Sequence, residues 1–296
     1  SMKRKWERDL GLQGRMIFTM FLLAAVYLFF LAFLSYYGTP PIFMLLFVGS
    51  FMAIQYFYSD KLVLMSSGAR VVSESEAPQL HGMITRLCAI ADLPKPQVAI
   101  VRSQIPNAFA TGRNRNKAVV AVTTGIMDKL SPAELEAVLA HELSHIKNRD
   151  MAVMTIASFI STLAFYFMRY SIYFGGMGGG DRRRDGGGII LIWLVSIAVW
   201  IVSFLLIRAL SRYREYAADR GSAIITGQPS VLASALMKIS GIMERIPSQD
   251  LRSVEGMNAF FTVPAISGSS IMDIFSTHPS VEKRIARLEK MQQKMI

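Results

Sequence analysis

The chain contains four long apolar runs separated by polar and charged segments. A helix that crosses the hydrocarbon core of a bilayer needs roughly 20 apolar residues. A single run of this kind also fits a buried core helix, but a soluble core in a chain of 296 residues has no room for four of them. The pattern therefore predicts four transmembrane helices, paired as two hairpins. They are Met16–Tyr37, Pro41–Tyr58, Met151–Phe174 and Ile189–Ile207.

Between the second and third runs, the pattern changes to that of a small mixed domain. Apolar residues recur at helical spacing over residues 77–93, which predicts an amphipathic helix. Shorter runs of β-branched and apolar residues follow, and the turn-forming sequence "GRNRN" separates the last two. The predicted strands are 97–101, 107–111 and 117–123.

A second helix of this domain is predicted to begin at Ser131. The Ser131 side chain can cap it, Pro132 suits the first helical position, and Glu134 completes a capping box. No helix breaker interrupts "LEAVLAHELSHIKN" after this start. The two histidines of that stretch therefore lie on a helix.

Composition and charge agree with a membrane protein. The chain is 52% hydrophobic with a mean hydropathy of +0.36, yet its net charge is +11. Many of the basic residues flank the apolar runs, where lipid headgroups and insertion bias favour them, and no nucleic-acid-binding signature is present. No nucleic-acid partner is expected. The single cysteine, Cys88, excludes an intramolecular disulfide framework and is expected to be a buried helix residue.

The distribution of basic residues predicts the orientation in the membrane. Five basic residues precede the first span, and the connection that follows it has no charge, so the N-terminus is expected in the cytoplasm. Two spans precede residues 61–150 and four precede the C-terminal region, so both segments are expected on the same side as the N-terminus. The glycine-rich loop 175–188 is expected outside as a flexible linker, although Arg182–Arg184 oppose this orientation.

The segment Leu139–Asp150, "LAHELSHIKNRD", carries the strongest chemical signal. His141 and His145 lie one turn apart on one helical face, where they can occupy two corners of a zinc site. Glu142 lies on the neighbouring face and can accept a proton from a water held at the open position. The alternative is an ordinary exposed helix whose histidines are only solvated.

A third ligand is expected from Ser211–Ala223, "SRYREYAADRGSA", which follows the fourth span. Glu215 can bind zinc, and Asp219, one turn later, can hold the second ring nitrogen of a ligand histidine. The alternative is a charged helix face on which Glu215 pairs with Arg212 or Arg214. Pairing of the third and fourth spans would bring this segment to the histidines.

These two segments and "STHPSVEKRIARL" resemble the three motifs of the HtpX-type membrane zinc metalloproteases, which are related to the CAAX prenyl endoproteases. The resemblance covers nearly the whole chain. It implies one catalytic zinc ion, with His141, His145 and Glu215 as its ligands, Glu142 as the catalytic base and Asp219 at the acidic position. It also implies a quality-control protease of the bacterial cytoplasmic (inner) membrane.

The expected fold class is α+β, with four transmembrane helices and a cytosolic, gluzincin-like zinc protease domain made of a small sheet and helices. The membrane hairpins divide the protease domain into two halves. The expected division is 1–60 for a stub and hairpin, 61–150 for the first half, 151–210 for the second hairpin and 211–296 for the second half.

Two further assignments leave alternatives open. His278 either stabilises the oxyanion of the reaction or only stands beside a helix start at Pro279. The strand 107–111 either pairs with substrate as a sheet edge or packs Phe109 into the core. The residues proposed for substrate are Asn107, Ala108, Phe109 and Ala110, and the segment 247–270 is a candidate cover over the cleft.

The predicted function is cleavage of misfolded or damaged membrane proteins, or of unfolded polypeptides, at the cytosolic face. The competing hypothesis is a non-catalytic membrane chaperone, or a transporter that uses the histidines as a metal gate. A gate needs ionisable groups within the spans, and these are nearly absent: the notable candidates are Gln55 and Arg169, the latter near a span end. The protease is therefore the favoured hypothesis. The sequence does not predict the oligomeric state or the identity of the substrate.

Overall fold

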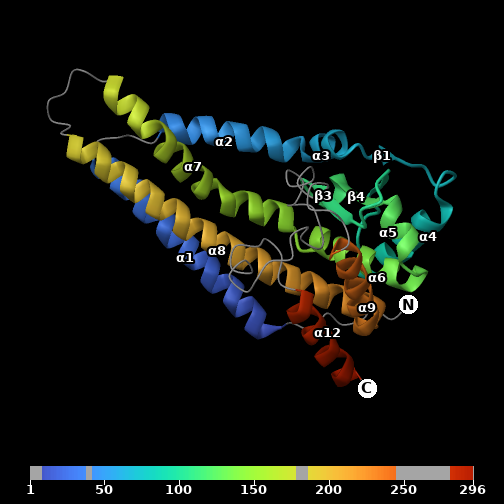
Figure 1. The fold of residues 1–296 in the computed structure, drawn as a ribbon. Coiled ribbons are helices and arrows are strands. Elements are labelled where there is room, and N and C mark those ends of the chain that lie inside the picture. The colour runs from blue at the N-terminus through green and yellow to red at the C-terminus, as the bar shows by residue number, and fades with distance from the viewer. Residues whose placement is uncertain (1–8, 38–41, 178–185, 245–280, 296) are drawn as a thin grey trace.

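The computed structural model describes residues 9–37, 42–177, 186–244 and 281–295. Long helices make one end of an elongated molecule, and a small mixed domain makes the other (Figure 1). The elements are α1 (Leu10–Tyr36), α2 (Ile42–Phe57), α3 (Ser59–Ser67), β1 (Arg70–Val71), α4 (Pro78–Ala91), β2 (Gln97–Val101), β3 (Ala108–Gly112), η1 (Arg115–Lys117), β4 (Ala118–Thr123), α5 (Thr124–Lys129), α6 (Pro132–Lys147), α7 (Asp150–Met177), α8 (Gly186–Thr226), α9 (Pro229–Glu244) and α12 (Val281–Met295).

Within the described residues, three helices are long and apolar enough to cross a membrane. They are α1, the Asp150–Arg169 part of α7, and the Gly188–Thr226 part of α8. The expected second span is not a single long helix. Helix α2 has 16 residues, and a 72° bend separates it from α3. Sixteen residues of helix span about 24 Å, less than the hydrocarbon core, so a fourth span requires α2 and α3 to cross as a broken pair.

The second hairpin is built by α7 and α8, which pack along each other, and α1 lies along α8 (Figure 1). The expected fourth span and the segment that carries Glu215 form one continuous helix of 41 residues. Because no turn separates them, the orientation of the span fixes the direction in which Glu215 and Asp219 point.

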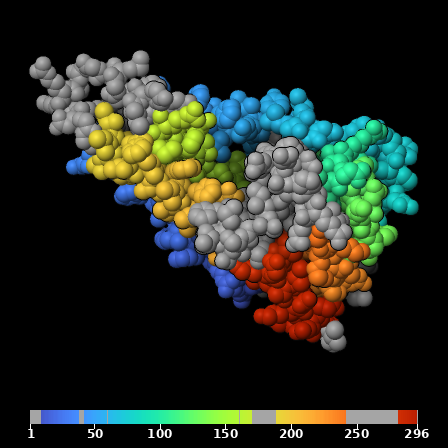
Figure 2. Space-filling view, viewed as in Figure 1, coloured from blue at the N-terminus to red at the C-terminus, as the bar shows by residue number. Residues whose placement is uncertain are grey.

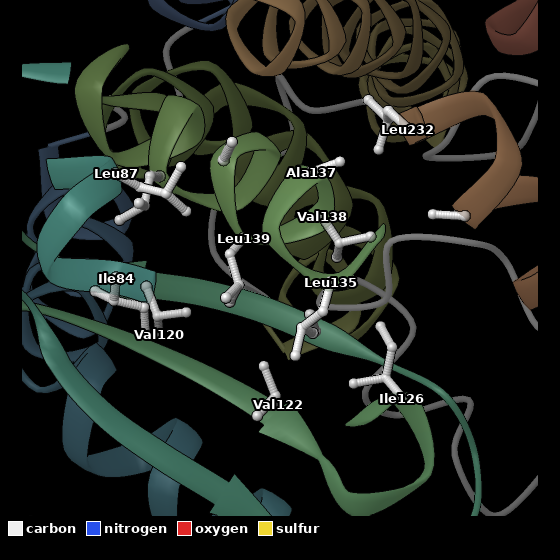
Figure 3. Close-up of a cluster of buried hydrophobic side chains, with 14 of the residues drawn as sticks. Ile84, Leu87, Val120, Val122, Ile126, Leu135, Ala137, Val138, Leu139 and Leu232 are labelled. Atoms are coloured by element: carbon white, nitrogen blue, oxygen red, sulfur yellow. The ribbon is translucent and has the colours of Figure 1, made fainter. Parts of the chain in front are cut away.

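The sheet has the strand order β1-β2-β4-β3, with β2 and β4 parallel and the other pairs antiparallel. The central strand β4 is buried at all six positions. Its Val120 and Val122 face the core beneath α4 and α6, whereas Val119 and Ala121 face α3 (Figure 3). Helices thus cover both faces of the sheet, as a strand that is buried throughout requires.

Helix α6 is held from several directions at once. Leu135 and Leu139 lie toward the sheet, and Val138 lies on the side of Leu232 of α9 (Figure 3). The Ser222 hydroxyl of α8 donates a hydrogen bond to the Ala137 carbonyl over 2.7 Å. The predicted capping box is confirmed: Ser131 accepts from the Glu134 amide, and the Glu134 carboxylate accepts from the Ser131 amide.

The helices α9 and α12 pack against each other and against α8. In the space-filling view they form one end of the molecule, next to the mixed domain (Figure 2). This arrangement brings Arg284 of α12 to the inner face of α8, where it is fully buried. Three elements far apart in the sequence therefore meet: α6, the final third of α8, and α12.

Candidate metal centre

The structure brings His141, His145 and Glu215 together at the crossing of α6 and α8. One donor atom from each of the three residues can be chosen so that all lie within 4.8 Å of one another. His141 is fully buried, and Glu215 is nearly so. The Arg214 guanidinium of the same helix lies 2.9 Å from Asp150. Glu215 is buried beside both histidines, so it does not lie on a solvated charged face.

The spacing of the donor atoms fits a single small cation. The Nε2 atoms of His141 and His145 are 3.1 Å apart. The Glu215 carboxylate lies 3.2 Å from the first of these atoms through Oε2 and 3.0 Å from the second through Oε1. A tetrahedral zinc site with bonds of roughly 2.0–2.1 Å separates its donors by about 3.3 Å. Two imidazoles and one carboxylate are also a donor set that catalytic zinc accepts, with its fourth position open.

The opposite ring nitrogen of each histidine faces a carboxylate. His141 Nδ1 lies 2.9 Å from Asp219 Oδ1, which is the position expected for Asp219. His145 Nδ1 lies 2.6 Å from Asp150 Oδ2 at the start of α7. A proton held at Nδ1 leaves the lone pair at Nε2 free to bind a metal. The donor set and its supporting carboxylates thus fit a zinc ion.

The electrostatic field of the site favours positive charge. Burial lowers the pKa of His145, but the nearby Glu215 and Asp150 carboxylates raise it more, so this pKa lies well above its usual value. For His141, Asp219 and Glu215 likewise outweigh burial, and its pKa is also raised. A metal cation that binds here displaces protons and meets the same negative field.

The sequence reasoning missed two residues of the site. Asp150 is the last residue of the motif that contains the histidines, but no helical spacing pointed to its contact with His145. Arg284 donates to both oxygens of Asp219, over 2.9 Å from Nε and 2.8 Å from Nη2, and its Nη2 lies 3.8 Å from Glu215. The alternation of charged and apolar residues on α12 signals only an amphipathic helix, so the full burial of Arg284 was not predictable.

The remaining predicted residues lie in three places. Glu142, which directly follows His141 on α6, is buried, and its charge acts on Arg284. His278 and the segment 247–270 lie outside the described residues. Residues 107–110 lie in and just before β3, which is an edge strand of the described sheet. Phe109 packs into the core beside α3.

The fold and the site together define a membrane-bound metalloprotease. The chain belongs to peptidase family M48, whose model matches residues 74–292. It is 84% identical over 294 residues to the "Protease HtpX homolog 2" of Methanosarcina acetivorans, a match that covers 99% of this chain and 100% of the relative. It is 58% identical over 295 residues to the "Protease HtpX homolog" of Moorella thermoacetica, covering 99% of each. The resemblance to HtpX-type proteases is confirmed, and the chain is a metalloendopeptidase.

A solved structure shares the fold. The Ste24p crystal structure from S. mikatae superimposes with a TM-score of 0.56 and 17% sequence identity, over 95% of this chain and 67% of that one. At this identity the likeness concerns the arrangement of helices and sheet alone. The shared fold agrees with the predicted fold class at the level of helices combined with a small mixed sheet.

Proposed function

We propose that this protein is a zinc-dependent endopeptidase that cleaves misfolded or damaged membrane proteins at the cytosolic face of the cytoplasmic membrane. One observation carries the proposal: two imidazole Nε2 atoms and one carboxylate converge at zinc-like spacing, while carboxylates hold both Nδ1 positions. Burying this set of polar groups costs free energy, and a bound metal ion would offset that cost. The ligands are His141, His145 and Glu215.

When bound, the zinc ion supplies Lewis-acid polarisation of the scissile carbonyl. Glu142 takes a proton from the attacking water and transfers it to the leaving amine. His141 and His145 keep their orientation because Asp219 and Asp150 hold their Nδ1 atoms. The guanidinium of Arg284 donates hydrogen bonds to Asp219, which contacts His141. Arg284 therefore positions His141 through Asp219 and has no direct role in the reaction.

Measuring bound metal together with cleavage of an unfolded polypeptide tests this function. Purified protein should contain one zinc per chain, lose cleavage on treatment with a chelator and regain it with added zinc. A chaperone would bind the polypeptide without cleaving it, and a metal-gated transporter would move metal without cleavage. Glu215→Ala should lose most of its zinc, because one of three protein ligands is gone. Full zinc occupancy in that variant would exclude Glu215 as a ligand.

The proposed topology places the zinc site and both termini in the cytoplasm, and Arg182–Arg184 outside. A Cys88→Ala background is suitable, because Cys88 is buried and burial raises the pKa of its thiol to about 11. Single cysteines at Ser73 and Gly178 can then be labelled in intact cells. Only the cysteine at Gly178 should react with an impermeant reagent, and labelling at Ser73 alone would invert the topology.

We also propose that β3 binds the extended substrate through its main chain. The Thr123 amide donates to the Asn107 carbonyl, which makes these two residues a hydrogen-bonded pair of the antiparallel ladder. The alternation of such a ladder turns the backbone N–H and C=O of Ala110 away from β4. Main-chain pairing gives affinity with little demand on substrate sequence.

Replacing Ala110 tests this role of the strand. Ala110→Pro should raise KM for the unfolded polypeptide, whereas Ala110→Ser, which keeps the amide, should not. Zinc content should be parental in both variants. If the zinc-loaded proline variant cleaves with parental KM, β3 does not hold the substrate.

A further inference from the structure

A cavity of about 880 Å³ lies between α1, α2 and α7, and apolar side chains make most of its lining. Along the helices it extends from Met20 to Leu28, from Gly49 to Phe57 and from Ala152 to Phe159. These stretches correspond to about 10–12 Å of helix rise. One hydrocarbon leaflet is about 15 Å thick. The cavity is therefore shorter than one leaflet and fits within it, and its lining is apolar like the leaflet interior.

Two cations lie at the end of the cavity that adjoins the mixed domain. The Arg113 guanidinium lies 5.7 Å from the ring centroid of Phe57, which lines the cavity. Lys61 Nζ lies 5.7 Å from the ring centroid of Tyr58, the next residue. Neither cation forms an ion pair with an acidic side chain in the part of the chain that the structure describes. Phe57 and Tyr58 are both 53% exposed, as aromatic residues at the headgroup level of a membrane are.

We propose that the cavity holds an acyl chain of an anionic phospholipid, with the lipid phosphate at Arg113 and Lys61. An apolar segment of a substrate would fill the cavity equally well, but it would bring no anion to these two cations. An anionic lipid satisfies both features at once: the chain covers the apolar lining, and the phosphate meets the two positive charges. Arg113 and Lys61 are thus lipid-binding residues, distinct from the zinc site.

This lipid site connects to the catalytic elements through the turn after β3. The Tyr56 hydroxyl, on the cavity wall, donates to the Arg113 carbonyl directly after β3. In the same turn, Arg115 Nη2 donates to the Lys147 carbonyl at the end of α6 over 2.6 Å. A bound lipid would therefore restrict the motion of both β3 and α6. Its effect on cleavage rests on the proposed function, whereas lipid binding itself does not.

Filling the cavity tests the position of the acyl chain. Ala53 lines the cavity, and its neighbour Ile54 does not, although 58% of Ile54 is exposed. Protein purified in a mild detergent should carry a phospholipid, detected by extraction and mass spectrometry. Ala53→Trp should lose it, and Ile54→Trp should keep it, both with parental zinc content. Gly49→Leu fills the cavity from a second position, should Ala53→Trp fail to fold.

Parental lipid retention in folded Ala53→Trp or folded Gly49→Leu would overturn the proposal. If such a variant also cleaved a membrane-embedded substrate slowly but an unfolded soluble one normally, the cavity would hold the substrate. Neither result would affect the zinc assignment, which is measured separately.

The charge of the headgroup is tested in nanodiscs of phosphatidylcholine alone or mixed with an equal part of phosphatidylglycerol. The parental protein should retain phosphatidylglycerol preferentially after transfer to detergent, as seen by native mass spectrometry. Arg113→Gln and Lys61→Gln should each weaken this preference about fivefold. Lys117→Gln, an exposed cation in the same connection between β3 and β4, should not. Equal retention of the two lipids, or an equal effect of Lys117→Gln, would contradict the headgroup assignment.

Discussion

The two histidines of the proposed zinc site are supported by the same chemistry in two different settings. Each Nδ1 atom faces an aspartate, and each aspartate faces an arginine. The buried triplet is His141, Asp219 and Arg284, with exposed side-chain fractions of 0%, 3% and 0%. The peripheral triplet is His145, Asp150 and Arg214, with 19%, 9% and 13%. We therefore expect burial, more than the type of contact, to decide how much each support contributes.

The two triplets also differ in how the chain assembles them. In the peripheral triplet, His145 and Asp150 are five residues apart across the junction of α6 and α7, and only Arg214, on α8, comes from a distant segment. In the buried triplet, the three residues come from α6, α8 and α12, so this triplet exists only after the whole domain has folded. We therefore expect substitutions in the buried triplet to lower both the stability of the fold and the metal affinity. Substitutions in the peripheral triplet should affect the stability less.

The largest effect is expected for Arg284→Met. The change leaves the buried Asp219 carboxylate without its counter-ion, and breaking a buried ion pair in this way costs about 3–5 kcal/mol. The variant should unfold at a markedly lower temperature in detergent and bind zinc weakly. Arg214→Met is the matched change in the peripheral triplet, and it should lower the unfolding temperature by less than half as much. Equal losses would refute the argument from burial.

Next in size are the two aspartates. Asp219→Asn and Asp150→Asn each remove the negative charge behind a ligand histidine, which typically costs about 10–100-fold in metal affinity or activity. The loss should be larger for Asp219→Asn, because it also leaves Arg284 buried without its nearest anion. Zinc titration against a competing chelator measures both losses. A larger loss for Asp150→Asn would show that the shorter contact, 2.6 Å, matters more than burial.

A smaller effect is expected far from both triplets, at the start of α6. Glu134 accepts hydrogen bonds from Lys238 and Ser234, and although burial opposes this, these partners lower its pKa to about 2. Because the folded-state pKa is depressed, the stabilisation is present above the ordinary carboxyl pKa and disappears as the pH falls toward 2. At neutral pH, Glu134→Gln should cost about 1 kcal/mol, because Lys238 is half exposed.

The unfolding temperature of the Glu134→Gln variant, followed between neutral and acidic pH, checks this prediction. The difference from the parental protein should shrink as the pH falls, while the zinc affinity at neutral pH stays unchanged. A constant difference across the pH range would mean that the charge of Glu134 is not the source of its contribution.

Local pattern predicted the elements that carry the site, because its signals lie within single segments. The capping box, the spacing of His141 and His145, and the spacing of Glu215 and Asp219 each depend on neighbours a few residues away. Contacts between segments were less accessible. The crossing of α6 and α8 was anticipated from the pairing of the spans, whereas Arg284 reaches Asp219 only through the packing of α12 on α8 and α9.

The membrane part shows the same limit in another form. Apolar length alone predicted where the spanning helices lie, but it could not separate a straight span from a bent one. The run Pro41–Tyr58 is uncharged and 18 residues long, yet α2 ends at Phe57 and the chain turns before α3. Conversely, no breaker lies between the last span and Glu215, and the structure continues them as one helix.

The central claim is that this cluster is a catalytic zinc site with Glu142 as its base, and one pair of measurements on Glu142→Gln tests it most directly. The variant should contain as much zinc as the parental protein, because Glu142 is not a ligand. Its cleavage of an unfolded polypeptide should fall by about 100-fold or more, the contribution expected of a general base. Glu136→Gln, on the same helix and paired with Arg86 at the surface, should change neither quantity. Cleavage at the parental rate by zinc-loaded Glu142→Gln protein would contradict the account.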